Sequence, residues 1–217
     1  MRRDARSSYI KTSRFRQDYR TVKRVFDLFS AALGLFLLVP LFLAIAVCIK
    51  LNSRGPVFYR GVRIGRHGRP FRIFKFRTMQ PDAERVGSTS TGQNDPRITR
   101  VGRRLRPWKL DELPQLLNVL TGEMSIVGPR PEVEEHTSAY TAEEKIILSV
   151  LPGITDYASI RFFNLNELVG SEDPRRVFIE KYRAEKNSLR VAYVRNQSLW
   201  TDIRIIFLTF ARIMTKR

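Results

Sequence analysis

The sequence has almost no cysteine or histidine, and this excludes several kinds of site. Cys48 is the only cysteine among 217 residues, so the chain can form neither an internal disulfide nor a zinc site built on cysteines. His67 and His136 are the only histidines. Two histidines are too few for a histidine-rich metal centre, and they leave few candidates for a Ser, His, Asp triad. The cysteine usage is consistent with a cytosol-facing protein.

Acidic residues are scarce compared with basic ones. The chain has 21 Asp and Glu against 39 Lys and Arg, which gives a formal net charge of +18. This surplus predicts an anionic partner, which could be nucleic acid, an acidic membrane leaflet or a phosphorylated small molecule. The aromatic residues cluster in apolar stretches rather than among the cations, which disfavours stacking on single-stranded nucleic acid. We therefore expect anionic membrane lipid, and no nucleic acid, as a partner.

Long apolar runs are absent apart from one, residues 31–49, which is about long enough to cross a bilayer. Basic residues flank it on both sides, with Lys23 and Arg24 before it and Lys50 after it. The positive-inside rule therefore assigns both ends to the cytoplasm, and Pro40 would break a helix near the middle. We predict a proline-broken helix that enters one leaflet and returns. A kinked helix that spans the bilayer is the alternative.

These features divide the chain into three parts. Residues 1–22, rich in Arg, Ser and Tyr, are predicted to form a basic tail. Residues 23–52 are the predicted re-entrant membrane helix. Residues 53–217 are predicted to form a cytosolic catalytic domain with helices at the membrane interface.

Local patterns in the cytosolic part predict a small β-hairpin and several helices. Residues 56–60 and 71–76 alternate apolar and polar side chains around a glycine-rich turn. Residues 110–120 place leucines on one face and should form a helix that ends at Gly122. Residues 199–214 predict an amphipathic helix at a membrane surface or, equally, a core-facing helix with a charged outer face. Further helices are predicted at 141–151 and 174–186, and a loop at 81–100.

The predicted fold class is α+β, as a mostly helical monotopic membrane protein. It combines the re-entrant membrane helix with the small hairpin and with amphipathic helices that lie on the surface.

An adjacent acid pair, Asp111 and Glu112, opens the helix predicted at 110–120. Acids in a first turn commonly serve only as capping or dipole residues. A carboxylate can also attack phosphorus and form an acyl phosphate. Because two neighbouring carboxylates titrate as a coupled pair, one can stay ionised as the nucleophile while the other positions a partner or handles a proton.

Attack on a diphosphate requires its negative charge to be neutralised. Mg²⁺ is the usual divalent cation where phosphates complete the metal's ligand shell. Arg106 and Arg130 are candidates to hold phosphate oxygens, and Lys75 and Arg77 on the presumed strand are additional ones.

Five short motifs and the apolar segment follow one another in a specific order. The motifs are KRVFD at 23–27, KFRTM at 75–79, LDELPQL at 110–116, GEMSIVGPRP at 122–131 and PGIT at 152–155. In this order they resemble the bacterial sugar transferases known as small monotopic phosphoglycosyltransferases, and the resemblance covers nearly everything after residue 22. It implies transfer of a phosphosugar from a UDP-sugar to undecaprenyl phosphate, with release of UMP, at the cytoplasmic face of the bacterial inner membrane.

The resemblance also implies roles for single residues. Asp111 matches the family nucleophile, which becomes covalently phosphoglycosylated and also binds Mg²⁺, and Glu112 matches its partner in the acid pair. The remaining matches are Arg106 and Arg130 for phosphate contacts, Pro129, Arg130 and Pro131 for the segment associated with the nucleotide, and Pro40 for the break in the membrane helix.

The chain departs from this family at some positions. Val39 stands where some relatives have Ser, and DYAS at 156–159 replaces the Gly-Trp-Ala-Gln of many relatives. Residues 162–174 are peculiar to this chain, so the sugar and the glycan pathway are not determined. Two other functions are weighed: a membrane-tethered basic module that binds anionic lipid or nucleic acid, and hydrolysis of the UDP-sugar. The sequence leaves a homodimer open.

Overall fold

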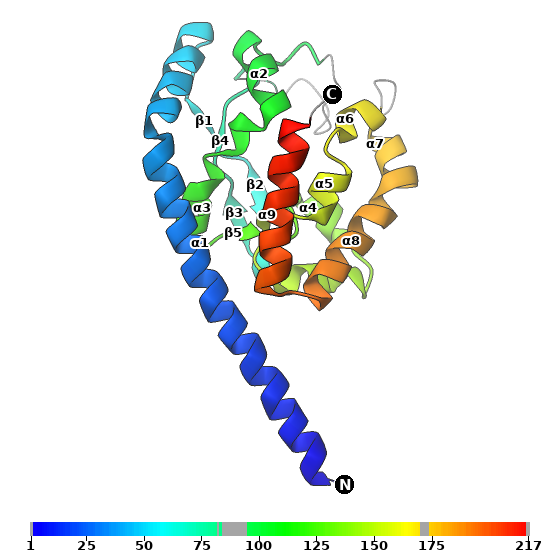
Figure 1. Cartoon of the computed structure of the whole chain (residues 1–217). Coiled ribbons are helices and arrows are strands. Elements are labelled where there is room, and N and C mark those ends of the chain that lie inside the picture. The colour runs from blue at the N-terminus through cyan, green and yellow to red at the C-terminus, as the bar shows by residue number, and fades with distance from the viewer. Residues whose placement is uncertain (1, 82, 84–94, 170–173, 216–217) are drawn as a thin grey trace.

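A computed structural model describes residues 2–81, 83, 95–169 and 174–215. From residue 18 onward, the long helix α1 (Arg2–Asn52) lies along one side of a domain of short helices and strands (Figure 1). Helices predominate, as the sequence analysis predicted, and the strands are two or three residues long.

α1 continues through Pro40 as one helix, which corrects the prediction of a break there. A proline removes one backbone donor and crowds the preceding turn, but packing on neighbouring elements can maintain the helix. Phe42 and Ile45 provide such packing directly after Pro40. The tail predicted for residues 1–22 belongs to the same helix from Arg2 on, because neither proline nor glycine occurs before Gly34. Re-entry into one leaflet stays a prediction.

One face of α1 is part of the domain core. Ala31 packs with Val119 and Met124, while Ile45 and Ile49 join a second cluster around Phe76 and Leu105. The stretch Asp18–Asn52 is the one part of the described chain that is long and apolar enough to cross a membrane. Large apolar side chains are exposed along the rest of its surface, among them Phe29, Leu33, Phe36, Leu37, Leu43, Val47 and Leu51.

The predicted hairpin is present and consists of two short strand pairs. The outer strands pair antiparallel through Phe58 with Phe76, and the inner strands through Arg63 with Phe71. His67 and Gly68 have positive φ angles of 59° and 74°, which lets the chain reverse between the inner strands. The strands are β1 (Phe58–Tyr59), β2 (Val62–Ile64), β3 (Pro70–Arg72) and β4 (Lys75–Phe76), and the turn holds the 3₁₀ helix η1 (Arg66–Gly68).

A parallel pair forms the centre of the domain: β5 (Ser125–Val127) and β6 (Gly153–Thr155). The two backbones approach so closely after β5 that a Cβ atom on Gly153 would lie 2.0 Å from the backbone nitrogen of Gly128. Glycine is therefore required at Gly153, and the chain that leaves β5 runs beside β6.

The helices match the sequence predictions to different degrees. Helix 110–120 is confirmed as the 3₁₀ turn η3 (Leu110–Glu112) followed by α3 (Gln115–Thr121), with Gly122 at φ 84° as its C-cap. Helix 141–151 is reduced to the 3₁₀ helix η4 (Glu144–Ser149). Helix 174–186 continues to residue 195 as α7 (Pro174–Val177), the π-helical η5 (Phe178–Tyr182) and α8 (Arg183–Arg195). The other helices are α2 (Arg100–Leu105), η2 (Arg106–Trp108), α4 (Glu134–Ser138), α5 (Tyr157–Arg161) and α6 (Leu165–Leu168). The loop predicted at 81–100 lies mostly outside the described residues.

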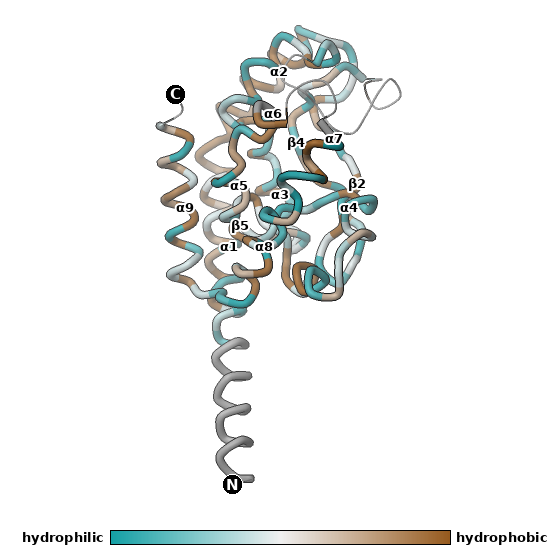
Figure 2. Tube along the Cα trace, turned by 90° about the vertical axis from the view of Figure 1, so that its right-hand side faces the viewer, coloured by the Kyte–Doolittle hydropathy of each residue, from teal (hydrophilic) through white to brown (hydrophobic). Residues whose placement is uncertain are grey.

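The last helix, α9 (Leu199–Met214), has the predicted bounds. Ile205 and Asp202 face the domain and are buried, whereas Trp200, Phe207 and Phe210 are 74%, 70% and 62% exposed. Figure 2 shows α9 at the outer edge of the molecule with hydrophobic residues along its length. An ordinary core-facing helix would bury these side chains, so the exposure favours the surface-lying interpretation.

Candidate active site

The acid pair lies in a buried turn that follows a residue in the left-handed conformation. Lys109 has φ 56°, and its N–H donates to the Arg106 carbonyl at 3.1 Å, so that η2 ends and η3 begins. A residue other than glycine seldom adopts this conformation, and such strain is common at functional sites. Asp111 and Glu112 follow, and each is only 8% exposed.

Glu112 is held by two cations. Arg130 Nη1 donates to Oε2 at 2.7 Å, Arg130 Nη2 donates to Oε1, and Lys75 Nζ donates to Oε1 at 3.0 Å. Burial alone would raise the pKa of Glu112, but the charges of Arg130 and Lys75 together lower it well below its ordinary value. Glu112 is therefore ionised, and both of its oxygens are occupied.

Asp111, the residue before Glu112, differs from it in both hydrogen bonding and pKa. Its Oδ1 atom is buried and has no hydrogen-bond partner among the described residues. Burial, followed by the negative charge of Glu112, raises the pKa of Asp111, and the nearby Lys75, Arg106 and Lys109 oppose this only in part. Asp111 thus has an oxygen available for an incoming electrophile or cation.

Arg106 supplies positive charge on the side of Asp111. Its Nε donates to Thr78 Oγ1 at 3.0 Å, which fixes the guanidinium against the segment after β4. Burial lowers the pKa of Arg106, and attraction to Asp111 counteracts part of that effect. The structure therefore brings together five of the predicted site residues: Lys75, Arg106, Asp111, Glu112 and Arg130.

Arg77 is not part of this group, and its assignment to phosphate binding stays a prediction. Its guanidinium donates to the carbonyl oxygens of Ser53 and Arg54, directly after α1, and to Ser53 Oγ at 3.1 Å. Side chains two residues apart in a strand point to the same face. β4 ends at Phe76, however, so Arg77 lies outside the strand and need not share a face with Lys75. Arg77 fixes the end of α1 instead.

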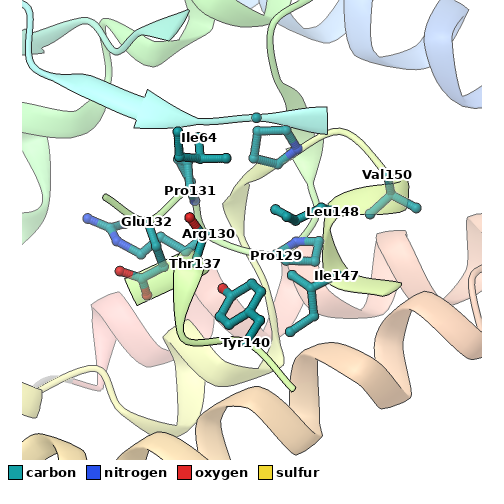
Figure 3. A pocket seen from close by; sticks show the side chains of 12 residues that line it. Ile64, Pro129, Arg130, Pro131, Glu132, Thr137, Tyr140, Ile147, Leu148 and Val150 are labelled. Atoms are coloured by element: carbon teal, nitrogen blue, oxygen red, sulfur yellow. The ribbon is translucent and has the colours of Figure 1, made fainter. Parts of the chain in front are cut away.

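Pro129 and Pro131 flank Arg130 in the chain that leaves β5. The Pro129 carbonyl accepts from the N–H of Gly153 at 3.0 Å, and the Arg130 N–H donates to Asp156 Oδ2 at 3.2 Å. Figure 3 shows both prolines at a small cavity, with Ile64 on one side and Tyr140 and Ile147 on the other. The prolines therefore fix the backbone from which the Arg130 side chain reaches Glu112.

Behind this segment lies a buried ion cluster that the sequence analysis did not identify. Arg190 Nη2 donates to Glu132 Oε1 at 2.8 Å, Lys186 Nζ donates to the same oxygen at 3.1 Å, and Arg190 Nε lies 3.5 Å from Asp156 Oδ2. Asp156 also caps α5, with Oδ1 accepting from the Ser159 N–H at 2.6 Å. An Asp between a strand and a helix is a recognisable N-cap signal. Arg190 lay beyond the predicted end of its helix.

The site offers few protein ligands for a metal. Among the described residues, no group of three or more His, Cys, Asp or Glu side chains could hold a metal ion. A Mg²⁺ ion that binds one or two carboxylates and takes its other ligands from phosphates and water is nevertheless common. Asp111 Oδ1, which lacks a hydrogen-bond partner in the described part of the chain, fits that arrangement, whereas the oxygens of Glu112 are occupied by Arg130 and Lys75.

Comparison with known proteins identifies the family. The bacterial sugar transferase family matches residues 18–216. An undecaprenyl-phosphate glucose phosphotransferase of Komagataeibacter xylinus is 42% identical over 203 residues, covering 90% of this chain and 36% of the relative. A UDP-glucose:undecaprenyl-phosphate glucose-1-phosphate transferase of Escherichia coli K12 is 42% identical over 193 residues, covering 88% of this chain and 39% of the relative.

These relatives are much longer, and the chain spans about two fifths of their length. The exopolysaccharide production protein ExoY of Rhizobium meliloti is closer in size: it is 39% identical over 210 residues, covering 90% of this chain and 86% of ExoY. The resemblance stated from the motifs is thereby confirmed. The chain belongs to the bacterial sugar transferase family.

Proposed function

We propose that the protein transfers a phosphosugar from a UDP-sugar to undecaprenyl phosphate and forms undecaprenyl-diphosphate-sugar and UMP. Relatives over nearly the whole chain carry names of this reaction. The observation that carries the proposal is the asymmetry of the acid pair. Glu112 is fixed by Arg130 and Lys75, whereas Asp111 Oδ1 has no partner among the described residues.

In the first step, Asp111 attacks the phosphorus that bears the sugar. The bond from that phosphorus to the oxygen shared with the uridine-bearing phosphate breaks, UMP leaves, and the sugar phosphate stays on Asp111 as an acyl phosphate. Arg106 lies where it can neutralise the diphosphate beside Asp111. Glu112 holds Lys75 and Arg130 next to Asp111, so that their positive charges also face the diphosphate.

In the second step, an oxygen of the lipid phosphate attacks the same phosphorus. The bond to Asp111 breaks and the carboxylate is regenerated. No proton has to be added in either step. The first step consumes the Asp111 carboxylate and releases a phosphate, and the second consumes a phosphate and releases the carboxylate, so the charges balance. Burial raises the pKa of the free carboxylate and thereby makes Asp111 a stronger nucleophile once it is ionised.

Mg²⁺ is part of the proposal. Asp111 would hold the ion together with phosphate oxygens of the donor, and the ion would supply charge neutralisation at the diphosphate. The fixed arginines and Lys75 serve the same purpose from the protein side.

We further propose that the protein is monotopic and works at the cytoplasmic face of the bacterial inner membrane. The exposed apolar residues of α1 and α9 suit contact with lipid, and the net charge of +18 suits an anionic leaflet. The reaction would be the first membrane step in the synthesis of a glycan such as an exopolysaccharide, as the name of ExoY suggests for that relative.

The test is UMP release by detergent-purified protein from a panel of UDP-sugars. We expect release to require undecaprenyl phosphate, Mg²⁺ and Asp111, and to occur with one sugar above the others. Intact mass after incubation with donor alone should increase by one phosphosugar, and Asp111→Asn should abolish the increase. Release that continues with water as acceptor would instead indicate a UDP-sugar hydrolase. A folded protein that acts on no donor would refute the transferase.

A further inference from the structure

Phe163 lies beside two cations that come from distant parts of the chain. Its ring centroid is 5.1 Å from Lys109 Nζ and 5.8 Å from Arg212 Cζ. Lys109 precedes the acid pair, and Arg212 belongs to the last turn of α9. Phe163 follows α5, just after its C-cap Phe162. The catalytic turn and the surface helix therefore meet at this ring.

Neither Lys109 nor Arg212 forms an ion pair within the part of the chain that the structure describes. The buried cations Lys75, Arg130, Lys186 and Arg190, in contrast, all pair with carboxylates. An aromatic face attracts a cation without cancelling its charge. Both cations therefore remain available to an anion from outside the protein.

Lys109 adjoins the acid pair. It directly precedes η3, which holds Asp111 and Glu112, and its carbonyl accepts from the Glu112 N–H at 3.1 Å. Arg106 and Arg130 act from other elements and are fixed by Thr78 and Glu112.

Apolar side chains that are open to solvent lie near both cations. Trp108, next to Lys109 in the chain, is 52% exposed, and Leu208, one turn before Arg212 on the same face of α9, is 38% exposed. A ligand with an anionic head and a long hydrocarbon chain matches this combination, because the cations suit the head and the apolar side chains suit the chain. A nucleotide sugar, which is polar throughout, does not match it.

We infer that Lys109, Phe163 and Arg212 form the subsite that receives the phosphate of the polyprenyl acceptor. The inference rests on the proposed function. It assigns the donor diphosphate to Arg106 and Arg130 and the acceptor phosphate to this second group of cations. In the second step the acceptor oxygen attacks the phosphorus on Asp111, and the bond from phosphorus to Asp111 breaks.

The two half-reactions can be measured separately. Exchange of labelled UMP into UDP-sugar, without lipid acceptor, reports the first step alone. The KM for undecaprenyl phosphate at saturating donor reports the acceptor. Both are measured in neutral detergent micelles, so that no other anionic lipid can occupy the cations. The variants are Arg212→Gln, Arg212→Lys and Phe163→Leu, with Arg204→Gln as the matched control because Arg204 is also an exposed arginine of α9.

We expect Arg212→Gln to raise the KM for undecaprenyl phosphate about tenfold, the effect of losing one charge-assisted contact. Arg212→Lys should recover part of this loss, and Phe163→Leu should raise the same KM. The exchange rate should fall far less than the acceptor step in each variant. Arg204→Gln should match the wild type.

Three results would overturn the inference. The acceptor KM could change equally in Arg212→Gln and Arg204→Gln, which would indicate a general charge effect of α9. The exchange rate could fall in proportion to the acceptor step, which would place Arg212 in the first step. If the wild type catalyses no exchange at all, the proposed covalent mechanism fails, and the acceptor subsite fails with it.

Discussion

Arg130 binds both carboxylate oxygens of Glu112, with Nη1 donating to Oε2 at 2.7 Å and Nη2 donating to Oε1. A planar guanidinium fork fits a carboxylate in this way, and a lysine ammonium cannot reproduce it. The backbone of Arg130 is fixed in turn by Asp156. The position of the acid pair thus depends on the segment after β5 as much as on its own turn.

We expect Arg130→Gln to lower stability by about 3 kcal/mol at neutral pH, because it leaves Glu112 buried with Lys75 alone. Because the pKa of Glu112 is lowered in the folded state, its pairing with Arg130 stabilises the fold fully above the ordinary carboxyl pKa. This stabilisation is lost as the pH falls towards and through the lowered pKa. The difference in the free energy of unfolding between variant and wild type should therefore become smaller on acidification. Thermal unfolding in detergent at pH 7 and at a pH well below the ordinary carboxyl pKa measures this, and a gap that stays constant would contradict it.

Asp111→Asn should abolish turnover, by a factor on the order of 10⁴ or more, while it raises the melting temperature. Burial and Glu112 raise the pKa of Asp111, so the ionised form destabilises the fold as the pH rises above the ordinary pKa of Asp. Asparagine removes that charge at nearly the same size. Turnover and thermal unfolding are compared at pH 7, with Asp111→Glu as the control that keeps the charge. A variant with a lower melting temperature than the wild type would show that the charge is stabilising.

Arg190→Met should destabilise the protein by roughly 3 to 5 kcal/mol, because Glu132 and Asp156 would remain buried with less compensation. Adding Glu132→Gln should recover part of the loss, since it removes one of the stranded charges. The two single variants, the double variant and the wild type form a double-mutant cycle for thermal unfolding. Strictly additive effects would mean that Arg190 and Glu132 are not coupled.

Membrane topology can be tested because Cys48 is the only cysteine. In a Cys48→Ser background, Arg20→Cys and Asn52→Cys place one thiol near each end of the apolar helix. If the segment re-enters, a membrane-impermeant maleimide should label both positions from the cytoplasmic side only. Labelling of the two positions from opposite sides would indicate a spanning helix.

The sequence predicted those parts of the fold that local patterns control. The hairpin, the helix that ends at Gly122 and the bounds of α9 follow from alternation, helical spacing and glycine, and all three are present. The acid pair, Lys75 and Arg130 were found because each belongs to a short motif.

Contacts between distant segments could not be predicted in the same way. Arg190 reaches Glu132 and Asp156 across many residues, and nothing in the local sequence of α8 indicates it. Arg77 stands two residues from Lys75, yet the end of β4 directs it to the carbonyls after α1. The continuity of α1 through Pro40 likewise depends on packing that a single helix does not reveal.

The long helix has a practical consequence for anyone who handles this protein. Ala31, Ile45 and Ile49 of α1 lie at the centre of two apolar clusters of the domain, so the anchor and the core are the same piece of chain. Deleting the apolar segment to obtain a water-soluble enzyme would leave two cavities in the hydrophobic core. The intact chain should therefore be purified in a detergent that covers the exposed apolar face of α1, and should not be truncated.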